Sequence, residues 1–134
     1  MYSYVLQDWI TLNVYMKLVD IVQSEMDWLS FQPYQDIIMW VEARSANAAG
    51  ANSVDIQFET SPVQDESLFL PMRPAVALTP GTPVVVPVVL SQIVAPDVPL
   101  ARWVRWRLKI NGRPSADWGA TFRVHCAANA VGLI

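Results

Sequence analysis

The clearest feature of this chain is a strict alternation of apolar and polar positions in two stretches of its second half. In residues 100–110 the apolar positions are Val104, Trp106, Leu108 and Ile110, and the polar positions are Arg105, Arg107 and Lys109. In residues 118–128 the apolar positions are Trp118, Ala120, Phe122, Val124, Cys126 and Ala128, and the polar positions are Thr121, Arg123 and His125. Successive side chains of a strand point to opposite faces, so each stretch is predicted to be a strand with one buried face.

The first half of the chain carries the same signal in shorter stretches. Residues 53–60 alternate around Val54, Ile56 and Phe58, whereas residues 36–44 are apolar at nearly every interior position. The second pattern is typical of a central strand that is covered on both faces. Residues 10–23 are predicted to form a strand region, with a helix as the alternative. Their apolar phase shifts after Leu18, which indicates a bulge or the junction of two segments. Residues 2–6 are expected to form a short strand or an arm.

Turn-forming residues divide the rest of the chain. Prolines separate three short predicted strands, at residues 67–70, 75–78 and 84–91. Pro87 interrupts the third and has no N–H to donate, so this strand is predicted to lie at a sheet edge or to contain a bulge. Residues 111–117 contain Gly112 and Pro114, and we expect them to join the two C-terminal strands as a hairpin with a long loop.

These elements predict an all-β fold in one domain. The count is seven to nine short strands spaced by about 8–12 residues, with little helix, which is typical of an antiparallel two-sheet sandwich. Its topology is predicted to be jelly-roll or immunoglobulin-like. We expect one domain over residues 1–134. Residues 1–9 could extend from it as an N-terminal arm, and residues 129–134 as a C-terminal tail.

The composition is unusually apolar for a domain of this kind. Hydrophobic residues make up 53% of the chain and charged residues 16%, against an average of about 25% charged. Either both faces of a sheet are covered, or apolar surface is buried against neighbouring chains. The composition therefore favours an assembled protein.

Neither a membrane span nor a signal peptide is expected. Ten prolines and scattered charges interrupt every run that approaches the roughly 20 apolar residues of a spanning helix. The first nine residues lack a basic region ahead of an apolar one. The single cysteine, Cys126, excludes an internal disulfide and fits the cytoplasm.

The net charge of −3 hides an asymmetry between the two halves of the chain. Residues 1–66 contain ten acids and two bases, a charge of −8, and residues 67–134 contain two acids and seven bases, a charge of +5. One interpretation is that the halves pair within one fold. The other is that acidic and basic surfaces of neighbouring copies meet, since complementary patches steer and register association.

The sequence offers no convincing catalytic or metal-binding motif. The only histidine, His125, is adjacent to Cys126, and adjacent strand residues point to opposite faces, so they cannot form a nucleophile–base pair. The five glycines are dispersed and form neither a nucleophile elbow nor a phosphate loop. Asp20, Glu25 and Asp27 could offer oxygens to calcium, but they lack the dense spacing of a calcium loop. We expect a protein without catalytic residues, cofactor or metal.

The six tryptophans are the remaining candidates for a binding role. Trp40, Trp106 and Trp118 fall on apolar faces and are predicted to lie in the core. Trp103 falls on the arginine face of its strand, where it could stack on a sugar or a base, or anchor a protein interface. The basic strip is short and the chain is acidic, which argues against nucleic acid. The predicted interface residues are Trp103, Arg105, Arg107 and Arg123.

Three segments carry a resemblance to a known class of proteins. The segment Phe58-Glu-Thr-Ser-Pro62, the Arg-Trp-Val-Arg-Trp-Arg strand of residues 100–110 and the closing strand of residues 118–128 resemble small all-β virion proteins of tailed bacteriophages. The resemblance covers residues 36–128. It implies a capsid decoration (cement) protein, or a related head or tail component, without catalysis.

The resemblance also implies partners and a location. The chain is expected to bind itself and a major capsid or tail protein, without nucleic acid or membrane, and to reside in the virion after synthesis in the host cytoplasm. The driving force would be burial of apolar surface, with the charge asymmetry providing register. The alternative is a carbohydrate-binding module of similar architecture, which would use exposed aromatic side chains such as Trp103.

Overall fold

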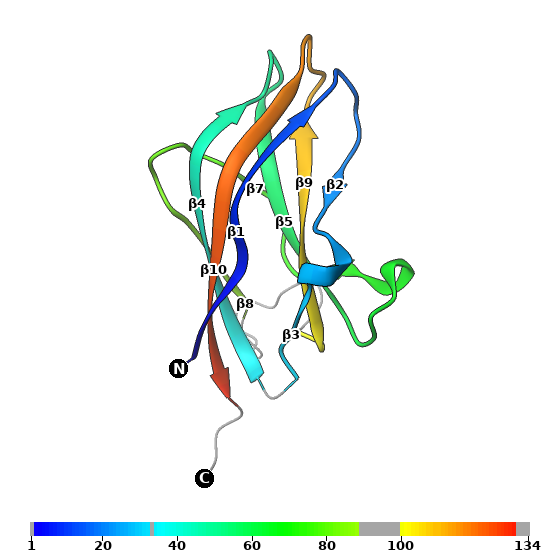
Figure 1. The fold of residues 1–134 in the computed structure, drawn as a ribbon, viewed down its shortest axis with the longest axis vertical. Helices are drawn as coiled ribbons and strands as arrows, with labels where there is room; N and C mark the ends of the chain where they lie inside the picture. Colours follow the sequence, from blue (N-terminus) through cyan, green and yellow to red (C-terminus); the bar gives the residue numbers. More distant parts are fainter. Residues whose placement is uncertain (1, 33, 89–99, 131–134) are drawn as a thin grey trace.

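In the computed structural model the chain forms two antiparallel sheets packed face to face (Figure 1). The structure describes residues 2–32, 34–88 and 100–130. Sheet A has four strands in the order β1 (Tyr2–Val14), β10 (Trp118–Ala130), β4 (Tyr34–Asn47) and β8 (Val84–Val88). Each neighbouring pair in this sheet is antiparallel.

Sheet B is built around two long strands and four very short ones. Its main order is β2 (Ile21–Val22), β9 (Trp103–Asn111), β5 (Ser53–Ser61) and β6 (Leu70–Pro71). In addition, β3 (Leu29–Ser30) pairs with β9, and β7 (Val76–Ala77) pairs with β5. Two 3₁₀-helices interrupt the connections, η1 (Glu25–Asp27) before β3 and η2 (Glu66–Leu68) before β6.

Six of the nine connections between the ten strands of the described residues cross from one sheet to the other. It starts in sheet A with β1, passes to β2 and β3 in sheet B, and returns to sheet A with β4. It then runs through β5, β6 and β7 in sheet B, crosses to β8, back to β9 and finally to β10. If β2 is counted with β3, and β6 with β7, each sheet has four positions, which is the arrangement of an eight-stranded jelly roll. An immunoglobulin-like sandwich instead keeps several consecutive strands in one sheet.

The predicted antiparallel two-sheet sandwich is confirmed, and so are the buried faces predicted for β5, β9 and β10. The apolar positions predicted for β5, β9 and β10 are nearly all at most 3% exposed: Val54, Ile56, Phe58, Val104, Trp106, Leu108, Trp118, Ala120, Phe122, Val124, Cys126 and Ala128. Ile110 packs against this core as a partly buried residue. The described residues form ten strands rather than seven to nine, because four of them are only two residues long.

The predicted hairpin between the last two strands is wrong. β9 pairs with strands of sheet B, whereas β10 lies between β1 and β4 in sheet A, so residues 112–117 cross between the sheets. An alternating pattern indicates that a strand has one buried face. The buried faces of β9 and β10 both lie in the core between the two sheets. The pattern carries no information on whether two such strands are hydrogen-bonded to each other or face each other.

The ends of the chain and the first strand region differ in part from the predictions. Residues 2–9 belong to β1 and thus to the sheet, and the strand ends at Val14, so residues 15–20 are not part of it. Met16 and Leu18, expected on the buried face, are 51% and 61% exposed. The expected C-terminal tail lies outside the described residues from position 131 on, and residues 129–130 belong to β10.

The strand β4 is central in its sheet, but in the part of the chain that the structure describes only its inner face is covered. Its inner side chains, Ile37, Met39, Val41 and Ala43, are buried. Trp40, which was expected in the core, lies on the opposite face and is 47% exposed. Pro87 behaves as predicted, since β8 is an edge strand of sheet A.

We expect Trp106→Ala to destabilise the protein by about 3–5 kcal/mol, because a large buried side chain would leave a cavity. Trp106 is 1% exposed, packs edge-on against Phe122 with ring centroids 5.0 Å apart, and donates its indole N–H to Gln7 at 3.1 Å. Urea titration followed by circular dichroism measures the loss. The control is Trp103→Ala, which removes a partly exposed tryptophan of the same strand and should cost much less. Similar losses for both variants would contradict the strand phase described above.

Candidate interaction surface

The outer face of sheet A carries a row of side chains that crosses all four strands. Val5 is paired with His125, His125 with Trp40, and Trp40 with Val85. Directly paired residues point to the same face of a sheet, so the four side chains lie side by side; we call them the apolar row. Val5, Trp40 and Val85 are 50%, 47% and 44% exposed, and the His125 side chain is 38% exposed.

A second row lies beside the first and continues the apolar character. Ser3 is paired with Ala127, Ala127 with Ile38, and Ile38 with Pro87. Ile38 and Ala127 are half-buried, and Pro87 is exposed. Together the two rows form a largely apolar surface on a regular sheet. No segment of the described residues covers this surface.

On the other side of the apolar row, charged side chains neutralise one another. Arg123 of β10 is directly paired with Glu42 of β4, and its Nη2 donates to both carboxylate oxygens at 3.1 and 2.9 Å. His125 Nε2 lies 3.3 Å from the same carboxylate. Half-exposed ion pairs of this kind contribute about 1 kcal/mol or less to stability. Their main effect here is to hold the Arg123 side chain in one orientation.

A bulge in β1 places an aromatic ring against that arginine. Gln7 is paired with Val124 and Ile10 with Phe122, so Asp8 and Trp9 together oppose the single residue Arg123. Two residues against one is the pattern of a β-bulge, which re-aims side chains. The Gln7 side chain turns inward to Trp106, and the Trp9 ring lies over the outer face.

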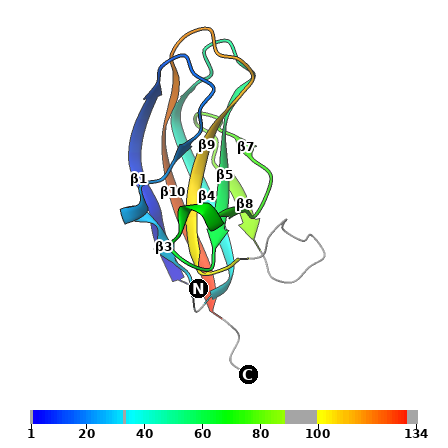
Figure 2. The same cartoon turned by 90° about the vertical axis from the view of Figure 1, so that its right-hand side faces the viewer.

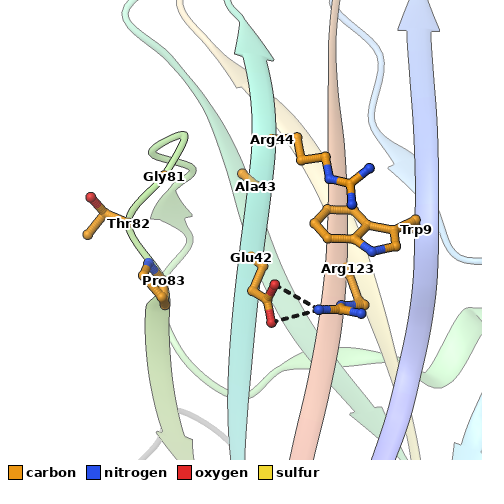
Figure 3. Close-up of a pocket in the computed structure, with 8 residues that line it drawn as sticks. All are labelled: Trp9, Glu42, Ala43, Arg44, Gly81, Thr82, Pro83 and Arg123. Atoms are coloured by element: carbon orange, nitrogen blue, oxygen red, sulfur yellow. Dashed lines mark hydrogen bonds and ion pairs between the residues drawn. The ribbon is translucent and has the colours of Figure 1, made fainter.

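Trp9 forms one wall of a pocket that opens on this face. The guanidinium carbons of Arg44 and Arg123 lie 4.0 and 4.7 Å from its ring centre, and Figure 3 shows the indole between the two groups. The pocket has a volume of about 360 Å³, and the following residues line it: Trp9, Glu42, Ala43, Arg44, Gly81, Thr82, Pro83 and Arg123. We call it the Trp9 pocket. It combines an aromatic wall, two cations and one carboxylate.

Arg105, predicted to face solvent at an interface, is instead buried on the outer face of sheet B. Its side chain is 1% exposed, and Nε donates to Glu59 Oε1 at 2.9 Å. Its guanidinium carbon lies 4.1 Å from the Phe69 ring centre and 5.1 Å from that of Trp28. These rings belong to the connections that contain η1 and η2; Figure 2 shows the η2 segment, in green, in front of sheet B. Arg105 therefore has no exposed surface to offer a neighbour.

The other predicted interface residues remain accessible to different degrees. Arg107 is 26% exposed and donates to Glu59 at 2.9 Å and to Asp20 at 3.2 Å. Burial lowers the pKa of Arg107, but the bonds and charges of Glu59 and Asp20 more than offset this, so its pKa is raised. Trp103 is half-buried beside Arg102, whose guanidinium carbon lies 5.5 Å from the ring centre.

The ion pairs of these arginines explain where the opposite charges of the two halves of the chain lie in the fold. Arg105, Arg107 and Arg123 come from the basic half of the chain, and their partners come from the acidic half. These pairs confirm the interpretation that the two halves pair within one fold. Contacts between copies stay a prediction.

His125 and Cys126 point to opposite faces, as predicted. Cys126 is 2% exposed with its sulfur 3.2 Å from that of Met39, whereas His125 lies in the apolar row. Burial raises the pKa of the Cys126 thiol to about 12. In the described ranges, no three His, Cys, Asp or Glu side chains gather as a metal would require. No helix in the described part of the chain is both long and apolar enough to span a membrane.

Sequence reasoning missed the residues that define this surface. Trp9 was expected at the end of an N-terminal arm (1–9), Trp40 was placed in the core, and Glu42 was not considered for a contact. Alternation gave no signal for the bulge. Leu6 and Ile10 both pack on the core side and are four positions apart, so the two register shifts in this part of β1 leave the period of two unchanged.

Comparison with known proteins reveals a shared fold. No protein-family model matches the sequence, and no curated protein matches it either. A chain in the structure of infectious bursal disease virus Gt strain is similar with a TM-score of 0.52 over 98% of this chain and 8% identity. A chain in the structure of the Gx strain of this virus has a TM-score of 0.42 over 99% of this chain and 11% identity. The present chain spans about a third, 32%, of each of those two chains.

We expect Cys126 to resist thiol reagents in the native protein, because its raised pKa leaves almost no thiolate at about pH 8 and the side chain is buried. Labelling with a chromogenic disulfide reagent should be slow without denaturant and complete after unfolding in guanidinium chloride. Cys126→Ser provides the blank. Rapid labelling of the folded protein would contradict the buried position.

Glu59→Ala should destabilise the protein by about 3–5 kcal/mol, because it leaves the buried Arg105 without its partner. Glu42→Ala is the matched control: it removes the same kind of pair where both side chains are about one-third exposed, and should cost about 1 kcal/mol or less. Urea titrations of both variants give the comparison. Equal losses would mean that burial does not distinguish the two pairs.

Proposed function

We propose that this chain is a non-enzymatic structural subunit of a virus particle, which assembles through protein–protein contacts on the outer face of sheet A. The observation that carries the proposal is the apolar row, because three large apolar side chains on it are about half exposed. An exposed apolar patch on a regular sheet is a typical site of protein association. Tryptophan and arginine, both present here, are enriched in such interfaces.

The fold supports the viral part of the proposal. Jelly rolls are frequent among virus shell proteins, and the similar chain with a TM-score above 0.5 comes from the structure of a virus. Further apolar surface lies at one end of the sandwich, where Tyr15, Met16, Leu18 and Val19 are 71%, 51%, 61% and 41% exposed. Such side chains would be covered in an assembled particle.

Within that class, we propose a capsid decoration (cement) protein of a tailed bacteriophage. This finer assignment rests on the resemblance of residues 36–128 to such virion proteins. Its partners would be further copies of itself and a major capsid or tail protein, and its location the virion. Trp103, Arg107 and Arg123, all partly exposed, are the predicted contacts that still have surface to offer.

One observation favours a second candidate, a carbohydrate-binding module. Jelly rolls also occur among lectin domains, and the Trp40 side chain is 47% exposed on the outer face of sheet A, where a sugar could stack on its ring. Trp103, the residue first considered for this role, is less exposed and has Arg102 beside its ring. Titration with a panel of oligosaccharides, followed by tryptophan fluorescence, would reveal this activity through a response that Trp40→Ala removes.

We expect the wild-type protein to self-associate in sedimentation velocity experiments, and Trp40→Ser to shift it toward the monomer by removing apolar area from the interface. Leu70→Ser is the control, since Leu70 is 55% exposed but lies in sheet B. The same runs with candidate capsid and tail proteins test association with other partners. A wild-type chain that stays monomeric at high concentration and binds none of them would contradict the proposal.

A further inference from the structure

The most exposed large apolar side chain in the described residues is Met26, at 93%. It is the middle residue of η1, between Glu25 and Asp27, whose side chains are also exposed. Neither carboxylate forms an ion pair within the described part of the chain. We call Glu25, Met26 and Asp27 the η1 knob. It presents an apolar side chain flanked by two negative charges.

The η1 knob is held firmly although its side chains are exposed. Gln23, 1% exposed, donates from Nε2 to the Leu6 carbonyl at 2.6 Å and to the Asp27 carbonyl at 3.2 Å. Trp28, on the other side of the knob, is buried and donates its indole N–H to the Gln23 carbonyl at 2.9 Å. A surface that is already ordered loses little conformational entropy when it binds.

The Trp9 pocket has the complementary chemistry. Arg44 stacks on Trp9 but, within the described residues, pairs with no carboxylate, whereas Arg123 is bound to Glu42. Stacking leaves the N–H groups at the edge of the Arg44 guanidinium available to a carboxylate. The aromatic wall suits a thioether, because methionine sulfur makes favourable contacts with aromatic rings.

We propose that the η1 knob of one copy of this chain inserts into the Trp9 pocket of a second copy. Met26 would lie against Trp9, and the carboxylates of Glu25 and Asp27 would bind Arg44. This inference rests on the proposed function, for which it names a partner and a contact. The pocket cannot be filled by the knob of the same copy, because Met26 is already 93% exposed where it lies.

The positions of knob and pocket allow a closed pair. Met26 and Asp27 line a groove together with residues 5–8 of β1, and the Trp9 pocket begins at the next residue of that strand. Arg123 contributes to both. When a protruding and a recessed feature lie this close together, a two-fold axis between them exchanges both at once. Each dimer would then contain two identical knob-in-pocket contacts.

The other 3₁₀-helix is a weaker candidate and therefore a good control. Leu68 of η2 is only 46% exposed. The neighbouring Asp65 carboxylate accepts bonds from the backbone N–H and hydroxyl of Ser67, which lower its pKa. The negative charge of Asp65 is thus already stabilised by hydrogen bonds within its own loop.

A charge exchange tests the proposal. One variant carries Arg44→Glu, and the other carries Glu25→Arg together with Asp27→Arg; circular dichroism checks that both fold. Each variant alone would place like charges at both contacts, and we expect its dimer dissociation constant to rise at least about tenfold in sedimentation equilibrium at low salt. In a mixture of the two, both contacts of the mixed dimer again join opposite charges, so association should return. Glu66→Arg, in η2, should leave the wild-type constant unchanged.

The outcomes separate this inference from the proposed function. Failure of the mixture to restore association, or unchanged dimers in each variant alone, would overturn the knob-in-pocket contact. If Trp40→Ser dissociates the protein in that case, the proposed function stands without it. A wild-type chain that remains monomeric would also overturn the contact, and the runs with capsid and tail proteins then decide the proposed function.

Discussion

The buried ion pair between Arg105 and Glu59 decides which face of the sandwich stays open. The two residues are directly opposite each other on β9 and β5, and both are less than 5% exposed. A charge in such a place is tolerated only when it is paired and hydrogen-bonded. The rings of Trp28 and Phe69 then cover the guanidinium, and this packing holds the η1 and η2 connections across sheet B. Part of the outer face of sheet B is thereby covered by the chain's own η1 and η2 connections.

Sheet A has the same chemical pair in a different setting. Arg123 and Glu42 are also directly opposite on neighbouring strands, but no connection of the described residues covers them, and each is about one-third exposed. The uncovered face keeps Val5, Trp40 and Val85 in contact with solvent. The excess of apolar residues in the composition therefore serves two purposes. Part of it builds the core between the sheets, and part of it lies on one outer face.

Residue pattern predicted the inner faces well and the outer faces poorly. The apolar positions of β5, β9 and β10 repeat every second residue, and the core requires that period. What covers an outer face depends on distant connections, so Arg105 was expected in solvent and is buried, while Trp40 was expected in the core and is exposed. The Trp9 pocket depends on a bulge and on three strands that are far apart in sequence. Local alternation also could not show whether β9 and β10 form a hairpin or lie in different sheets.

The position of β10 in sheet A sets the order in which this protein can fold. β10 is the last strand of the described residues, yet it lies between β1 and β4 and provides hydrogen bonds to both. During synthesis, β1 and β4 are made before the strand that joins them, and until then only β4 has a neighbour in sheet A, the edge strand β8. Long-range pairing of this kind folds slowly and exposes aggregation-prone edges while it is incomplete. Until β10 is in place, the strand edges of β1 and β4 that it joins remain open to pairing with other chains.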